Sequence, residues 1–188
     1  MRVMRHLRHR RLRIAIALAV VMGAIAVPLA VIGFASAGDD NSLTAVAKSA
    51  TGRFHNLSAA QAAGWNVLVI DKFGITCIDN QPVGGMGFHY ANPSPLGDAV
   101  LDPTTPEALV YAPNAAGQSK LAALEYIVFA DAWTAAGNTG PPQLFGQQYL
   151  FNPAGNRFGL PPFWALHVWI WHPNPAGMFQ PWNPRVHC

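Results

Sequence analysis

The sequence predicts an α+β domain built on a mainly antiparallel, curved β-sheet or partial barrel with one or two short helices. An N-terminal hydrophobic export helix is expected to precede it. Three observations lead to this fold class. Short runs of apolar and β-branched residues alternate with turn-rich segments, in a chain that holds 17 glycines and 16 prolines. One clear helical pattern precedes the first of these runs. A long uncharged apolar stretch follows a basic segment at the N-terminus.

The first 37 residues have the order of an export signal. Residues 2–13 carry six arginines, and residues 14–34 are apolar without a charge. Residues 35–37 then read Ala-Ser-Ala, a small-x-small cleavage pattern. The apolar run is also long enough to span a bilayer, so an anchor in the cell membrane is the alternative to a cleaved signal peptide. Both interpretations predict a secreted or otherwise extracytoplasmic protein.

Behind this leader we expect a linker or short helix over residues 38–52 and a single globular α+β domain over residues 53–188. The chain has 12 Lys and Arg against 9 Asp and Glu, but six of the cations lie in residues 1–37. The remainder therefore has a net charge of 6 − 9 = −3. This charge argues against nucleic-acid binding. We expect contact with a membrane only through the N-terminal segment, if that segment is not cleaved.

The only two cysteines of the chain are Cys77 and Cys188. In an exported protein, pairing into one disulfide is the natural expectation. The alternative is a free redox thiol, but the sequence has no Cys-x-x-Cys motif to support it.

The first elements follow from local signals. Residues 56–64 predict a helix, with Ser58 and Gln61 at capping-box spacing and Gly64 suited to end it. Residues 67–70 are β-branched or apolar and predict a strand. Three glycines within residues 84–87 indicate backbone that must bend or pack closely.

The later strands carry more apolar residues. Strands are predicted at residues 108–111, 120–130 and 163–171, and residues 131–162 read as loops with an optional short helix at 143–149. Alternation along residues 120–130 places Leu121, Ala123, Glu125, Ile127 and Phe129 on one face, and the other face is also apolar.

The segments 84–90, 120–130 and 163–171 each carry one polar side chain in an apolar setting. These side chains are His89, Glu125 and His167. An unpaired buried carboxylate is costly, so Glu125 needs a metal, a hydrogen-bonding partner or a raised pKa. Two imidazoles and one carboxylate are the ligands of facial-triad iron sites and also suit an open zinc site. Zinc, iron or copper is therefore a possible cofactor.

Two other interpretations of these residues stay open. Glu125 and His167 are candidate catalytic acid–base groups around a small-molecule ligand, with Tyr90, Tyr126 and Trp169 as candidate pocket walls. Alternatively, the histidines and the carboxylate form a hydrogen-bonded network that only stabilises the core, in a structural envelope protein without a site. The spacing does not decide, because the sequence contains no His-x-His or His-Glu-x-x-His motif.

Several motifs together resemble a family of small exported bacterial proteins of unassigned function. They cover most of residues 53–188: Gly-Met-Gly-Phe-His-Tyr at 85–90, Leu-Asp-Pro-x-x-Pro-Glu-Ala-Leu-Val-Tyr at 101–111, Leu-Glu-Tyr at 124–126, Leu-Phe-Gly-Gln at 144–147, the run 158–172, and Asn-Pro-x-Gly-Met-Phe followed by Trp-Asn-Pro-x-Val-x-Cys within 174–188. The resemblance implies that His89, Glu125, His167, Cys77 and Cys188 belong to a family pattern. It implies no activity, substrate or cofactor.

Overall fold

The computed structural model describes residues 37–114 and 116–188, and the leader up to residue 36 lies outside them. The helices are α1 (Ala37–Thr51), the 3-10 helix η1 (Gly52–His55), α2 (Leu57–Ala62) and α3 (Ala130–Ala135). The strands are β1 (Val67–Leu68), β2 (Cys77–Asn80), β3 (Gly84–Ala91), β4 (Ala108–Pro113), β5 (Ser119–Phe129), β6 (Gln143–Leu144), β7 (Gln147–Gln148), β8 (Leu150–Asn152) and β9 (Phe163–Val168).

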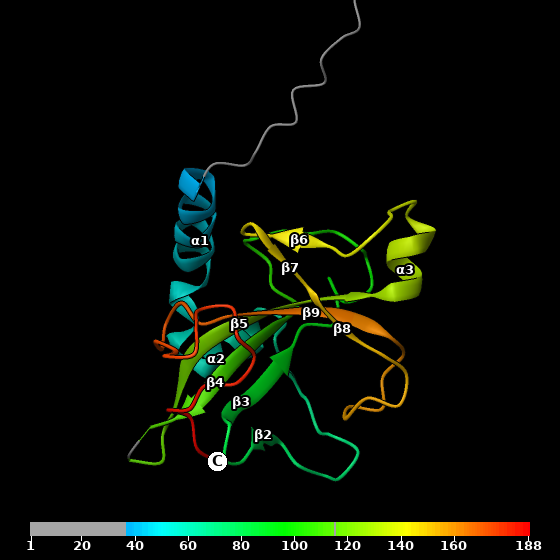
Figure 1. Ribbon diagram of the computed structural model, residues 1–188. Coiled ribbons are helices and arrows are strands. Elements are labelled where there is room, and N and C mark those ends of the chain that lie inside the picture. The colour runs from blue at the N-terminus through cyan, green and yellow to red at the C-terminus, as the bar shows by residue number, and fades with distance from the viewer. Residues whose placement is uncertain (1–36, 115) are drawn as a thin grey trace, which may run out of the picture. The chain divides into compact units, whose positions relative to one another are not determined.

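Seven strands form one sheet in the order β1-β3-β4-β5-β9-β8, with β2 also paired to β3 (Figure 1). Every pair in this sheet is antiparallel, and β6 and β7 form a separate hairpin. The predicted α+β fold with a mainly antiparallel sheet is confirmed. Among the described residues, none of the helices combines the length and the apolar character that crossing a membrane requires.

The main hydrophobic core lies on one face of the sheet. Tyr111 of β4 and Tyr126 of β5 are almost fully buried there, together with Phe54 of η1 and Ala60 of α2. The Tyr111 hydroxyl donates a hydrogen bond to the Phe54 carbonyl at 2.6 Å. These contacts hold the N-terminal helices against β4 and β5, where α2 is visible behind the strands in Figure 1.

The opposite face is covered by the C-terminal segment. Val186 and Trp169 are buried there in a second cluster with small residues of β4 and β5. The predicted disulfide is present: Cys188 is bonded to Cys77 of β2, with 5.7 Å between the Cα atoms. It ties the end of the chain to the sheet, and it favours an extracytoplasmic location because cytosolic thiols are kept reduced.

The glycines of β3 allow this close approach. A Cβ atom on Gly85 would lie 2.8 Å from the Val186 carbonyl oxygen, so a larger residue would push the C-terminal segment away. The Gly85 and Asn183 backbones exchange hydrogen bonds of 3.1 and 3.0 Å. The prediction that the glycine-rich segment packs closely is confirmed. Its partner is the C-terminal segment, in which Asn183 lies 183 − 85 = 98 residues from Gly85 along the chain.

Two local predictions about the strands are wrong in detail. A bulge pairs Val110 with Ala123 but Tyr111 with Leu121, so Leu121 joins the main core instead of the face of Glu125. The last strand ends at Val168, three residues earlier than expected.

The segment between β5 and β9 also differs from its prediction. Residues expected to be loop-like begin with helix α3. The optional helix at 143–149 is instead the β6–β7 hairpin, because Phe145 and Gly146 both have positive φ, at 55° and 66°. Two such residues form the type I′ turn that matches the twist of paired strands.

Candidate metal centre

Three strands bring His89, Glu125 and His167 to the face of the sheet that the C-terminal segment covers. Glu125 of β5 lies directly opposite His167 of β9 in the strand register. His89 comes from β3, on the far side of β4, so its side chain must cross that strand to reach Glu125. The residue of β4 opposite Glu125 is Ala108, which is fully buried. Its single methyl group leaves the space in which the two long side chains meet.

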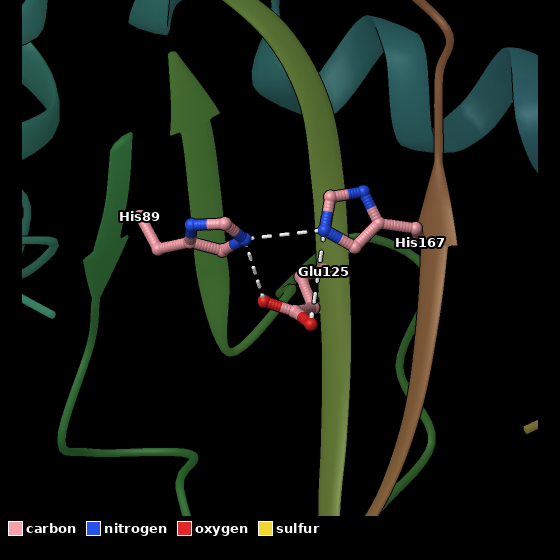
Figure 2. Close-up of side chains that lie close together, drawn as sticks. All are labelled: His89, Glu125 and His167. Carbon is pink, nitrogen blue, oxygen red and sulfur yellow. Dashed lines mark hydrogen bonds and ion pairs between the residues drawn. The ribbon is translucent and has the colours of Figure 1, made fainter. Parts of the chain in front are cut away.

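The ligating atoms of the three side chains converge on a single point (Figure 2). The two Nε2 atoms are 3.1 Å apart, and His89 Nε2 lies 3.2 Å from Glu125 Oε2. His167 Nε2 is 3.8 Å from the other carboxylate oxygen, Oε1. One potential ligand atom from each residue can be chosen so that all three lie within 4.8 Å of one another. No other group of three or more such residues is found in residues 37–114 and 116–188.

These separations fit bonds to one metal ion. With metal–nitrogen bonds of about 2.05 Å, two nitrogens 3.1 Å apart subtend an angle of about 100° at the metal. The His89–Glu125 separation of 3.2 Å leads to an angle of about 100° as well. This value lies between the right angle of an octahedral face and the tetrahedral angle. The third separation, 3.8 Å between His167 Nε2 and Glu125 Oε1, corresponds to an angle of about 135°, so a shared ion requires a small movement of the carboxylate or the His167 ring.

Burial controls the protonation of the three groups. His89 is 2% exposed, His167 4% and Glu125 8%. Burial raises the pKa of Glu125 to about 8. It lowers the pKa of His89 to about 4, against the opposing effect of the Gly87 carbonyl, and with the nearby His89 it holds the pKa of His167 well below its ordinary value. At neutral pH the metal-free centre is therefore uncharged, and the imidazoles have the neutral form in which histidine binds metals.

The outward nitrogens of both rings lack hydrogen-bonding partners. Within the described part of the chain, His89 Nδ1 and His167 Nδ1 are buried without a partner in hydrogen-bonding geometry, although the Gly87 carbonyl lies near enough to His89 to favour its protonated form. Packing holds the rings instead: the centroids of the two imidazoles lie 5.4 Å apart, and the Trp169 ring lies 5.4 Å from that of His167. Since an unsatisfied buried polar atom costs about 1–3 kcal/mol, a purely structural network would leave this cost uncompensated at His167 Nδ1.

Two cavities adjoin the centre. A cavity of about 160 Å³ reaches Glu125 and His167, and its walls include Met86, Asn152 and Trp182. A smaller one of about 40 Å³ reaches Glu125 and His89 beside Ala108. Phe158 and Phe163 line both cavities, as Glu125 does. The Glu125 carboxylate thus faces open space on two sides.

The candidate wall residues divide between the two faces of the sheet. Trp169 contacts His167 through its ring. Tyr90 and Tyr126 point to the other face, into or against the main core, where Tyr90 meets Tyr111 at 5.5 Å and the Tyr126 hydroxyl donates to the Pro103 carbonyl. The structure does not bring these two tyrosines together with Glu125. Tyr90 follows His89 and Tyr126 follows Glu125 along the strand, and successive side chains of a strand point to opposite faces of the sheet.

Sequence reasoning missed residues that shape this region. Met86 is one, because a register shift in the β2–β3 ladder turns it toward the larger cavity. Glu107 is another: it is 3% exposed, its carboxylate accepts a hydrogen bond from the Ile127 amide, and burial raises its pKa to about 8. The position of Glu107 directly before the apolar run 108–111 was the available signal in the sequence. The bulge has no signal in the sequence apart from the glycines that flank Met86.

A partly buried ion pair anchors the segment between β8 and β9. Arg157 Nε lies 2.6 Å from Asp71 Oδ2, and its Nη1 donates to the Asp79 carbonyl. Because Phe158 follows directly, this pair positions one wall of both cavities. Comparison of the chain with family models, curated proteins and solved structures found no match.

Proposed function

We propose that this chain is an extracytoplasmic metal-binding protein in which His89, Glu125 and His167 hold one divalent transition-metal ion. The single observation that carries the proposal is the convergence of two imidazole Nε2 atoms, 3.1 Å apart, with a carboxylate oxygen 3.2 Å away. Three strands contribute these atoms, so the arrangement does not follow from any local motif.

The ligand set favours a particular class of ion. Imidazole nitrogens suit zinc, copper, iron and nickel, whereas magnesium and calcium prefer sites made of oxygen atoms alone. Two imidazoles and one carboxylate supply three protein ligands, and catalytic or otherwise open sites use three and leave at least one position free. Zinc, iron(II) and copper(II) therefore remain the candidate ions, and the nearby cavity favours an open site over a closed structural one.

The extracytoplasmic part of the proposal draws on two features. The disulfide between Cys77 and Cys188 requires an oxidising compartment to persist. The basic and apolar order of the first 37 residues is that of an export signal or anchor. The resemblance to small exported proteins agrees with both. The catalytic roles for Glu125 and His167 stay a prediction, because they need a substrate.

Metal analysis of the purified protein tests the proposal. We expect about one equivalent of zinc or another transition metal to bind with micromolar or tighter affinity in isothermal titration calorimetry. His89→Ala, Glu125→Gln and His167→Ala should each weaken binding at least tenfold, since loss of a residue that only orients a ligand already costs about 10–100-fold. The matched control is His172→Ala, which removes a partly buried imidazole whose ring centroid is 6.5 Å from Trp169 and which is not part of the trio.

The competing structural interpretation leads to a different result. If the trio only stabilises the core, the wild-type protein retains no transition metal, and the three substitutions change thermal stability alone. That outcome would end the metal proposal. Equal loss of affinity in His172→Ala would also contradict it, because the metal would then not be held by the trio.

A further inference from the structure

We propose that the metal ion accepts a small, singly charged oxygen-donor ligand with an apolar body, such as a phenolate or a short-chain carboxylate, from the larger of the two cavities. This inference rests on the metal site proposed above and names the ligand class of that site. Four properties of the cavity carry it: its position, its volume, the polarity of its walls and the charge of the centre.

The position of the cavity determines which side of the metal is open. The larger cavity touches Glu125 and His167, but His89 does not line it. The His89 ring lines the smaller cavity together with Ala108 and Ile127. A ligand entering the larger cavity therefore approaches the metal along the edge between the carboxylate and His167. Leu150, which is 53% exposed, lies at the rim of the cavity and marks its side toward solvent.

The volume limits the size of the ligand. The larger cavity measures about 160 Å³. An engineered protein cavity of about 150 Å³ binds benzene, so this one accommodates a molecule of about six or seven non-hydrogen atoms. The smaller cavity of about 40 Å³ has room for little more than a water molecule. A sugar, a nucleotide or a peptide would not fit into either space.

The walls select a ligand with an apolar body and one polar end. Glu125, His167 and Asn152 are the polar members of the lining. The walls are otherwise apolar, and besides Leu150 they consist of Met86, Phe158, Phe163, Ala165, Pro181 and Trp182. The polar end of a ligand would therefore point at the metal, with the Asn152 amide and the Trp182 indole N–H as the further hydrogen-bonding groups of the lining. Its hydrocarbon part would lie against the aromatic rings, as in most small-molecule sites.

The charge of the centre selects an anion. A divalent ion bound by two neutral imidazoles and one carboxylate has a net charge of +1. No acidic residue other than Glu125 lines either cavity among the described residues. An uncompensated buried charge is costly, so a monoanion that fills the open position neutralises the centre, whereas a neutral molecule does not.

The test uses cobalt(II) as a visible probe of the metal and butyrate as the ligand. We expect butyrate to shift the visible absorption of the cobalt-loaded protein with saturation. Butyramide, its neutral counterpart of nearly equal size, should bind at least tenfold more weakly, and decanoate should not bind at the same site. Equal responses to butyrate and butyramide would refute the selection for an anion.

A cavity-filling substitution tests the location. Ala165 lines the larger cavity and is not a ligand, so Ala165→Phe should reduce butyrate affinity at least tenfold while cobalt affinity changes less than threefold. The control Ala154→Phe adds the same side chain at an exposed position outside the cavity and should leave both affinities unchanged. If Ala165→Phe does not fold, as judged by circular dichroism, Ala165→Leu replaces it.

The outcomes separate this inference from the metal proposal. If cobalt binds but butyrate does not shift the spectrum, the ligand inference fails and the metal site stands. If cobalt does not bind, the metal proposal fails first. If butyrate binds equally well to the wild type and to the filled variant, its site is not this cavity and the inference is overturned.

Discussion

Replacing Ala108 with leucine should abolish metal binding without touching any ligand. Ala108 is fully buried on β4, opposite Glu125, and lines the small cavity together with His89 and Glu125. A leucine side chain there would occupy the space in which the side chains from β3 and β5 meet. The expected consequence is a displacement of His89 or Glu125, because the adjoining cavity of about 40 Å³ is too small for the added carbon atoms and the rest of the interior is well packed.

The magnitude follows from the separation of the imidazoles. With bonds of about 2.05 Å, one metal ion can join two nitrogens only while they are closer than about 4.1 Å. The Nε2 atoms are 3.1 Å apart, so the margin is about 1 Å. A leucine adds three carbon atoms to the side chain of residue 108, and the displacement that they impose on His89 or Glu125 would exceed that margin. We therefore expect at least a hundredfold loss of metal affinity, and an overpacking cost of about 1–3 kcal/mol in unfolding free energy.

Calorimetric metal titration and guanidinium unfolding measure the two effects separately. The matched control is Ala112→Leu. Ala112 is a buried residue of the same strand and lines neither cavity. It should have a similar cost in stability and bind metal normally. Metal affinity within threefold of the wild type in folded Ala108→Leu would refute the reasoning that the methyl group of Ala108 permits the convergence.

Three further outcomes are expected. Metal affinity should rise with pH up to about 8 and then level off, because binding must displace the proton that burial keeps on Glu125, whose pKa is raised to about 8. Potentiometric or calorimetric titration between about pH 6 and 9 measures this dependence, and a flat profile would contradict it. The metal-free protein should lose stability as pH rises from about 4.5 to 8, because burial raises the pKa of Glu107 from 4.5 to about 8 and the folded state then binds more protons than the unfolded one. Glu107→Gln should make this decline shallower in guanidinium unfolding, and an unchanged slope would show that Glu107 does not cause it. Cys188→Ser should lower the unfolding free energy by about 5 kcal/mol, since the disulfide closes a segment with a sequence separation of 111 residues. A loss below about 1 kcal/mol would mean that the C-terminal segment is held mainly by Val186 and Asn183.

The C-terminal segment has a structural role that links the disulfide to the candidate site. Pro181 and Trp182 form part of the larger cavity, and Val186 is fully buried a few residues later. The segment is held at its end by Cys188 and along its length by the backbone bonds between Asn183 and Gly85. Loss of the disulfide should therefore loosen a wall of the site as well as lower stability. The three ligands stay on the sheet in either case.

The polar trio itself could be identified from the sequence for a simple physical reason. A carboxylate or imidazole within a long apolar strand pattern must have a partner, because its burial is otherwise too costly. Glu125 and His167 each stand out in this way, and His89 follows a glycine-rich segment between two aromatic residues. The same reasoning did not identify Glu107, since a residue at the edge of an apolar run is usually exposed. It assigned Tyr90 and Tyr126 to the pocket although alternation along the strands argues for the opposite face.

The sequence by itself determined the α+β class, the positions of β4, β5 and β9, the pairing of the only two cysteines and the identity of the unusual polar residues, because these depend on local periodicity, composition and counting. Only the tertiary structure decided that the three side chains meet. Their convergence depends on which strands are neighbours, on the register that sets Ala108 opposite Glu125, and on two bulges that reorient Leu121 and Met86. Such pairings join residues far apart in the chain, and their energies depend on packing that no local pattern contains.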